Sequence, residues 1–177
     1  MEERLDRTQE VAGSSPASST LQVTTGSDDR DAAARAIIDE IAFMTLATVD
    51  AQGAPWACPV WFAHADYSEF LWVSRPETRH SQNIAATPRI AIVIFDSRTP
   101  INMGRGVYIE AEAAEITDEA EIEQGIAIFS KRSLAQGGSG WTADEIRPPA
   151  ELRPYRATVS RAFLGINDRR TEVRLSR

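Results

Sequence analysis

Short apolar stretches separated by polar turns recur from residue 43 onward. In residues 106–116, Val107, Ile109 and Ala111 alternate with other residues, which is typical of a strand with one face in the core. Residues 90–95 are apolar throughout, which indicates a strand buried on both faces. The complete pattern predicts six or seven strands, at residues 43–49, 54–63, 69–74, 89–95, 106–116, 152–164 and 171–175.

Three further segments predict helices. An apolar stripe in residues 31–41 predicts a helix that Asp28 or Asp29 could cap. Residues 78–86 and 117–131 predict two more helices. Because the strands are joined mostly by short turns, with few crossovers, the pattern favours a mainly β fold. The specific expectation is a six- to seven-stranded antiparallel split β-barrel with flanking helices.

The first thirty residues differ from the rest of the chain. Residues 1–30 are polar and without periodicity, which predicts a disordered tail, followed by a single domain over residues 31–177. The Gly-Ser-Ser-Pro stretch at residues 13–16 can be encoded by the T-arm consensus of transfer-RNA genes. This coincidence suggests that translation starts downstream, for example at Val23, and that the leader is a mis-assigned start.

Composition excludes several classes of partner. The chain has 177 residues and a net charge of −7, which disfavours nucleic acid or an anionic membrane as a partner. It has no apolar run of the roughly 20 residues that a membrane span needs. Cys58 is the single cysteine, so no internal disulfide can form, and a cytoplasmic location is expected. Two histidines and one cysteine do not make a usual structural zinc site, so no metal is expected.

Polar and cationic side chains gather in residues 74–84, where the chain leaves a predicted strand and starts a short helix. The segment holds hydroxyls, two arginines, a histidine and an amide. Hydroxyls and the free N–H groups of a helix start accept an anion, and arginine adds bidentate charged hydrogen bonds. The segment therefore predicts a phosphate-binding site. The alternative is a polar turn that caps a helix, with Arg79 and His80 merely solvated.

Several motifs occur in a fixed order along residues 34–164. They are a hairpin over residues 45–62, the sequence Arg79-His80-Ser81-x-Asn83-Ile84, and the strands ending at residues 97 and 113. This order resembles the flavin-binding split-barrel family related to pyridoxamine 5′-phosphate oxidase. The resemblance implies an FMN-dependent oxidoreductase that acts on a small molecule and holds the flavin at a homodimer interface. The alternatives are a deazaflavin-dependent reductase of the same fold, or a non-catalytic module that binds flavin or haem.

The resemblance also implies the cofactor contacts. The strand that matches the family's ring-binding strand would offer backbone hydrogen bonds to the flavin, and the following strand end would reach the ribityl chain and phosphate. Arg79 and His80 match a basic pair that holds the phosphate, and an adjacent phosphate would favour protonated His80. No residue is assigned as catalytic. The full set of implied cofactor contacts is Trp56, Ala57, Cys58, Pro59, Val60, Val73, Ser74, Arg79, His80, Ser81, Asn83 and Ser97.

Two departures separate the chain from the true oxidases. Gly106 stands where those enzymes carry a glutamine, and the chain ends without their Arg- and Trp-rich signature. We therefore expect a relative of the oxidases with a different small-molecule substrate.

Overall fold

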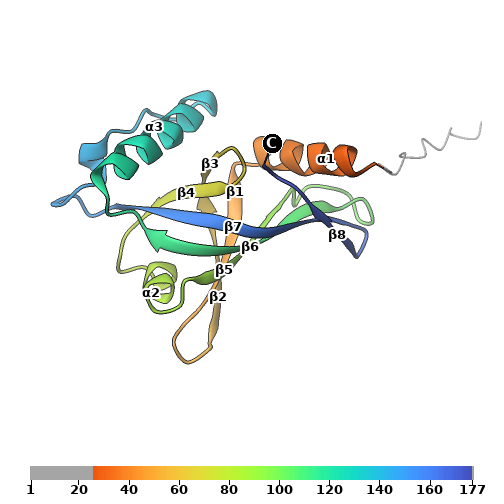
Figure 1. Cartoon of the computed structure of the whole chain (residues 1–177), viewed down its shortest axis with the longest axis horizontal. Helices are drawn as coiled ribbons and strands as arrows, with labels where there is room; N and C mark the ends of the chain where they lie inside the picture. Colours follow the sequence, from red (N-terminus) through yellow and green to blue (C-terminus); the bar gives the residue numbers. More distant parts are fainter. Residues whose placement is uncertain (1–25, 177) are drawn as a thin grey trace, which may run out of the picture.

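The computed structural model describes residues 26–176, which form one sheet with helices around it (Figure 1). The predicted tail and the alternative start at Val23 lie outside these residues, except for residues 26–30. Helix α1 (Ser27–Glu40) begins four residues before the predicted start at residue 31. Gly26 is its N-cap, and the two aspartates expected to cap it, Asp28 and Asp29, lie in its first turn instead. Their carboxylates are favourable there because the helix dipole is positive at this end.

The sheet confirms the predicted antiparallel split barrel. Its strand order is β2-β1-β5-β6-β7-β4-β3, with β8 paired to the part of β7 that β4 does not reach, and every pairing is antiparallel. The strands are β1 (Phe43–Val49), β2 (Pro55–Trp61), β3 (Ala63–Ala65), β4 (Glu69–Ser74), β5 (Arg89–Phe95), β6 (Arg105–Glu115), β7 (Arg153–Ile166) and β8 (Arg169–Val173).

A bend in one predicted strand closes the barrel. The stretch expected at residues 54–63 is divided into β2 and β3, so the sheet has eight strands where six or seven were expected. These two strands occupy opposite ends of the strand order although they follow each other in sequence. The sheet therefore curls until its edges meet at Phe62, which is fully buried at the bend.

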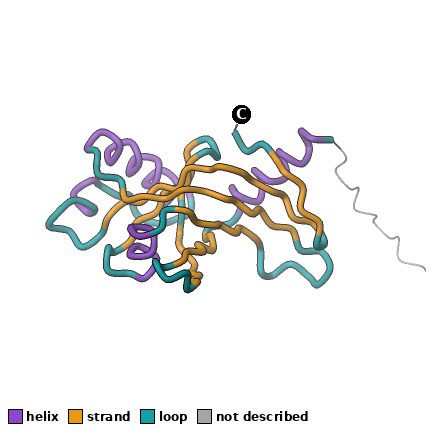
Figure 2. The backbone as a smooth tube through the Cα atoms, turned by 60° about the horizontal axis from the view of Figure 1, so that its bottom comes forward, coloured by secondary structure: helices purple, strands orange, loops and turns teal. Residues whose placement is uncertain are grey.

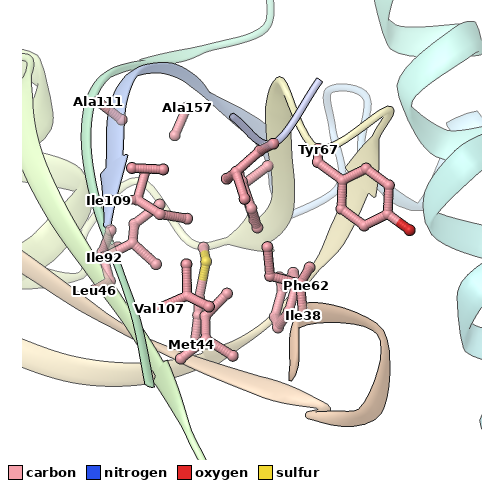
Figure 3. Packing of buried hydrophobic residues seen from close by; sticks show 14 of the residues in the cluster. Ile38, Met44, Leu46, Phe62, Tyr67, Ile92, Val107, Ile109, Ala111 and Ala157 are labelled. Atoms are coloured by element: carbon pink, nitrogen blue, oxygen red, sulfur yellow. The ribbon is translucent and has the colours of Figure 1, made fainter. Parts of the chain in front are cut away.

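Alternate positions on the strands fill the interior. Val107, Ile109 and Ala111 of β6 are buried as predicted, and they pack with residues of β1 and β5 such as Leu46 and Ile92 (Figure 3). Such alternation is what one buried face requires. Helix α1 adds Ala34 and Ile38 to the same cluster.

The prediction for β5 was wrong in one respect. The apolar run was expected to be buried on both faces, yet only Ile90, Ile92 and Ile94 are buried, whereas Ala91 and Phe95 are exposed. Within residues 26–176, no helix covers this outer face. A continuous apolar run does not show whether the second face of a strand is exposed in one chain, because the same sequence suits a strand whose second face is covered by another chain.

Within residues 26–176, the α-helices lie around the sheet (Figure 2). Helix α3 (Glu119–Ala135) packs on β3 and β4 through a second apolar cluster, and a 3-10 turn, η1 (Ala143–Glu145), follows it. Helix α2 (Arg79–Ala86) lies beside the hairpin of β1 and β2. Among the residues that the structure describes, no helix combines the length and apolar character needed to cross a membrane.

Candidate functional site

The start of α2 is where the phosphate site was expected. Thr78, the N-cap, has extended backbone angles, and its side chain makes no capping hydrogen bond. Its Oγ1 lies 2.9 Å from the carbonyl oxygen of Arg75 and 2.9 Å from Oγ of Ser81. No side chain therefore occupies the N–H groups of the first turn as a cap. Uncapped N–H groups at a helix start are favourable partners for an anion.

His80 points inward from the second position of this helix. Its ring is 8% exposed, and Nε2 lies 2.6 Å from Oγ of Ser74 at the end of β4. Nδ1 lies 3.3 Å from Sγ of Cys58 on β2. His80 thus joins two strands that are not paired to each other in the sheet.

Burial determines the protonation states of His80 and Cys58. Desolvation lowers the pKa of His80 below its ordinary value of 6.5, and burial raises the pKa of the Cys58 thiol. At neutral pH the thiol is therefore protonated and the imidazole neutral. The thiol can donate to Nδ1, which leaves the Nε2–H to donate to Oγ of Ser74.

Ser81 and Asn83 are also buried, and they attach the helix to the barrel. Nδ2 of Asn83 donates to Oγ1 of Thr48 on β1 over 2.9 Å. A hydrogen bond from the Ser81 hydroxyl to the Tyr155 oxygen opposes the rise that burial causes in the pKa of Tyr155. Three of the predicted contact residues on α2 therefore face the barrel, and their polar atoms are engaged there.

Arg79 alone among the α2 residues assigned to the phosphate turns outward. Its side chain is 47% exposed. The guanidinium lies over the ring of Trp56, 4.8 Å from the ring centre, and 4.0 Å from the carboxylate of Asp50. The ion pair at this distance is weak, so the guanidinium keeps hydrogen-bonding capacity toward solvent or an anion.

The predicted ring-binding strand β2 is an edge strand. It pairs only with β1, so within the described chain its second edge has no strand partner. Trp56, Cys58 and Val60 share a face with the buried residues of β1 that pair with them, whereas Ala57 and Pro59 are exposed on the other face. The free edge offers N–H and C=O groups, although Pro59 contributes no N–H.

A hollow of about 790 Å³ lies on the outer face beside these residues. It is lined by residues of β1, β2, β5 and β6, including Trp56, Ala57 and Arg89. Its volume is in the range of small-molecule and cofactor sites. Arg89 forms no side-chain hydrogen bond or ion pair within residues 26–176, so it adds a second available cation near Trp56.

Ser97 and Val73 complete the predicted set, and the structure separates Ser97 from the rest. Ser97 follows the far end of β5, whereas Arg89, which lines the same hollow as Trp56, begins β5. The seven residues of β5 rise about 3.3 Å each, so roughly 20 Å separate the two ends. Within one chain, Ser97 therefore does not lie close to Arg79. Val73 is half-buried on β4, one residue before Ser74.

Sequence reasoning missed Thr48 and Arg89. Thr48 lies on the inner face of β1 in line with Met44 and Leu46, so a polar residue at that position signals a buried polar partner. Arg89 is an outward-facing cation at the first residue of β5 and was not distinguishable from a solvated strand end. Among the described residues, no group of three or more His, Cys, Asp or Glu side chains is placed to hold a metal ion.

Comparison with known proteins gives a consistent likeness. The sequence pattern of the family described as pyridoxamine 5′-phosphate oxidase matches residues 31–162. The pyridoxine/pyridoxamine 5′-phosphate oxidase of Cupriavidus necator is 29% identical over 139 residues, covering 77% of this chain and 62% of that enzyme. The chain thus spans less than two thirds of the length of that curated relative.

Solved structures share the fold at lower identity. A haem-binding protein from Mycobacterium smegmatis superimposes with a TM-score of 0.65 at 20% identity, covering 81% of this chain and 57% of that one. The haem storage protein HutZ from Vibrio cholerae gives a TM-score of 0.59 at 18% identity, covering 78% of this chain and 93% of that one. At these identities the likeness is one of fold.

Proposed function

Because the chain belongs to the pyridoxamine 5′-phosphate oxidase family, we propose that it is an FMN-dependent oxidoreductase acting on a small molecule. The observation that carries the proposal is the outward-facing Arg79 at the uncapped start of α2, in contact with Trp56. The departures at Gly106 and at the C-terminus favour a substrate other than that of the true oxidases. Since the chain spans only part of the curated relative, the substrate is proposed only as a class.

The phosphate of FMN would be held by Arg79 and the first N–H groups of α2. A guanidinium and a helix start together supply charge-assisted hydrogen bonds in a fixed geometry. His80 has a supporting role in this account, since its contacts with Ser74 and Cys58 fix the helix start against β4 and β2.

The flavin ring would lie along the free edge of β2, whose backbone groups can hydrogen-bond a ring edge without a particular side chain. Bound FMN supplies hydride and electron transfer, which are chemistry of the cofactor. The protein binds and orients it, and the exposed ring of Trp56 limits water at that edge. No general base is required for such chemistry, which is consistent with the absence of an assigned catalytic residue.

A homodimer is part of the proposal. Phe43 and Phe95 are 57% and 48% exposed on the outer face of β1 and β5, where a second chain would cover them. In a dimer, the Ser97 of the second chain could reach the flavin, because the separation between Ser97 and Arg79 applies only within one chain.

Haem is the alternative cofactor, because the structural neighbours described above are named as a haem-binding and a haem storage protein. A haem iron commonly takes a histidine as its axial ligand. The sequence has two histidines: both ring nitrogens of His80 have partners as described, and Nε2 of His64 contacts Asp39 at 3.1 Å. Flavin is therefore the better fit to these residues. A deazaflavin would meet the same phosphate and backbone groups, so it is compared directly in the test below.

The test is the affinity of purified protein for FMN and for a deazaflavin, measured by calorimetry in wild type and in Arg79→Ala. Loss of one charge-assisted hydrogen bond should cost about 1.5–3 kcal/mol, which is about 10- to 150-fold in FMN affinity. The matched control is Arg75→Ala, because Arg75 is exposed in the same segment but is held by Glu151 at 2.6 Å. It should change affinity by less than about threefold. Unchanged affinity in Arg79→Ala would refute the role of Arg79.

A further inference from the structure

A carboxylate lies beside the arginine that is proposed to hold the flavin phosphate. Asp50 follows the last residue of β1, at the start of the hairpin loop that leads to β2. Its Oδ2 is 4.0 Å from Nη2 of Arg79, and its side chain is only 29% exposed, so solvent screens the charge incompletely. A negative charge next to a site for an anion lowers the affinity for that anion.

The hairpin loop holds this carboxylate in place. Oδ1 of Asp50 accepts hydrogen bonds from the N–H groups of Gln52 at 3.0 Å and Ala54 at 2.8 Å. The backbone of Asp50 is fixed as well, because its N–H donates to the carbonyl of Ala54 and its carbonyl accepts from the N–H of Gly53. Since Oδ1 is engaged by two donors, Oδ2 is the oxygen that faces Arg79.

The same hairpin also supplies the aromatic contact of Arg79. The ring of Trp56 lies 4.8 Å from the guanidinium carbon, and Trp56 pairs with Thr48 of β1, two residues before Asp50. Within residues 26–176, the guanidinium donates no hydrogen bond, and its ion pair is with Asp50. A phosphate at the start of α2 would therefore meet an arginine with unused donors and one weakly held carboxylate.

The other cations of this segment do not offset the charge of Asp50. Arg75 is held by Glu151 at 2.6 Å. Burial keeps the pKa of His80 below 6.5, so its ring is neutral at pH 7. Arg79 is thus the cation of residues 74–84 that Asp50 and a bound phosphate would share.

We propose that Asp50 is a specificity-determining residue of the flavin site. Its carboxylate competes with the flavin phosphate for Arg79 and thereby sets how strongly the site prefers FMN over riboflavin, which lacks the phosphate. Displacing a partly exposed ion pair costs little, so FMN still binds, but it gains less from Arg79 than it would beside a neutral residue. This inference rests on the proposed function, because it concerns the same arginine.

The test is calorimetry of FMN and riboflavin on the full chain, in wild type and in Asp50→Asn. Asparagine keeps an oxygen that can accept from Gln52 and Ala54, so the loop is preserved and the charge is lost. The affinity for FMN should rise about two- to fivefold, the range typical of a partly exposed ion pair. The affinity for riboflavin should not change. An unchanged affinity for FMN, or an equal gain for riboflavin, would overturn the proposal.

Two further variants separate charge from structure and from net charge. Asp50→Glu keeps the charge but changes the loop contacts, so it should show no gain for FMN. Asp66→Asn removes the same charge from the exposed turn between β3 and β4, far from α2 in the chain, and should leave the affinity for FMN unchanged. A gain in either variant would contradict a specific effect of the Asp50 charge.

A double variant shows whether Asp50 acts through Arg79. In the Arg79→Ala background, Asp50→Asn should leave the affinity for FMN unchanged, because the shared cation is gone. The gain in the single variant should also shrink at high salt, since salt screens partly exposed charges. A gain that persists without Arg79 would overturn the competition for Arg79.

The outcomes distinguish this inference from the proposed function. If FMN binds and Arg79→Ala weakens it, but Asp50→Asn binds FMN as wild type does, the role of Asp50 is refuted and the flavin site stands. If neither wild type nor Asp50→Asn binds FMN, the proposed function is refuted, and the role of Asp50 is refuted with it.

Discussion

His80 is a residue whose chemistry is decided by its three-dimensional surroundings. Its sequence neighbours, an arginine before it and a serine after it, suggested a contact with a phosphate. In the structure the ring is buried between Cys58 and Ser74, and it is neutral at pH 7 because desolvation lowers its pKa. His64 is similar, since burial lowers its pKa although Asp39 opposes that change.

We predict that the free energy of unfolding falls as the pH is lowered from about 7 to about 5.5. The pKa of His80 lies below 6.5 in the folded chain and returns to about that value on unfolding, so the unfolded chain binds a proton that the folded chain does not. The loss amounts to at most about 1.4 kcal/mol per pH unit for one such group. Urea denaturation at a series of pH values measures it.

Two variants test how much each histidine contributes to the dependence of stability on pH. His80→Gln should reduce the dependence of stability on pH, and His64→Gln should remove the separate part that His64 contributes. If stability is constant over this range in wild type, the buried neutral state of His80 is wrong.

Arg79 and Trp56 were chosen as candidates, but nothing in the sequence distinguished them from Ser81 and Asn83. All four are residues that can contact a phosphate or a ring. Which of them faces outward depends on how an eight-residue helix seats against the barrel, and that is a property of the element.

At the scale of elements, helix α2 shows why its inner face was not predicted. Its position at residues 78–86 was expected within one residue, since it is observed as Arg79–Ala86. Its buried positions are His80, Ser81, Asn83 and Ile84, of which only one is apolar. Sequence analysis looks for apolar residues at helical spacing, so a helix that buries polar groups in satisfied hydrogen bonds gives no such signal.

The polar attachment of α2 is open to a direct test. Asn83→Ala removes the donor to Thr48 and leaves a buried hydroxyl with a poorer partner, so we expect a loss of about 1–3 kcal/mol in the free energy of unfolding. Gln82→Ala, one residue earlier on the exposed side of the same helix, should change stability by less than about 0.5 kcal/mol. Equal effects of the two substitutions would show that this hydrogen bond does not hold α2 in place.

At the scale of the whole molecule, the fold class was predictable, whereas the exposure of the outer face of β5 was not. Strands with alternating apolar residues, joined by short turns, were enough to predict an antiparallel barrel, because those features are local in sequence. The division of one strand at Phe62, which brings the two edges of the sheet together, depends on contacts distant in sequence. The exposed outer face of β5 depends on whether another chain covers it, which no single-chain pattern contains.

We predict that the protein is a homodimer through this outer face. Ala91 lies exposed at its centre, so Ala91→Lys should convert a particle of twice 19.5 kDa into one of 19.5 kDa in light scattering or sedimentation. Ala127→Lys, the same change on the exposed side of α3, should leave the mass unchanged. A monomeric wild type, or an Ala91→Lys variant that remains dimeric, would rule out this interface.

The central claim is that the chain binds a flavin at the start of α2. The most direct measurement is the absorbance spectrum of freshly purified protein, recorded again during titration with FMN. We predict a flavin spectrum and saturation at one FMN per chain. A Soret band without flavin absorbance, or no change on adding FMN, would contradict it.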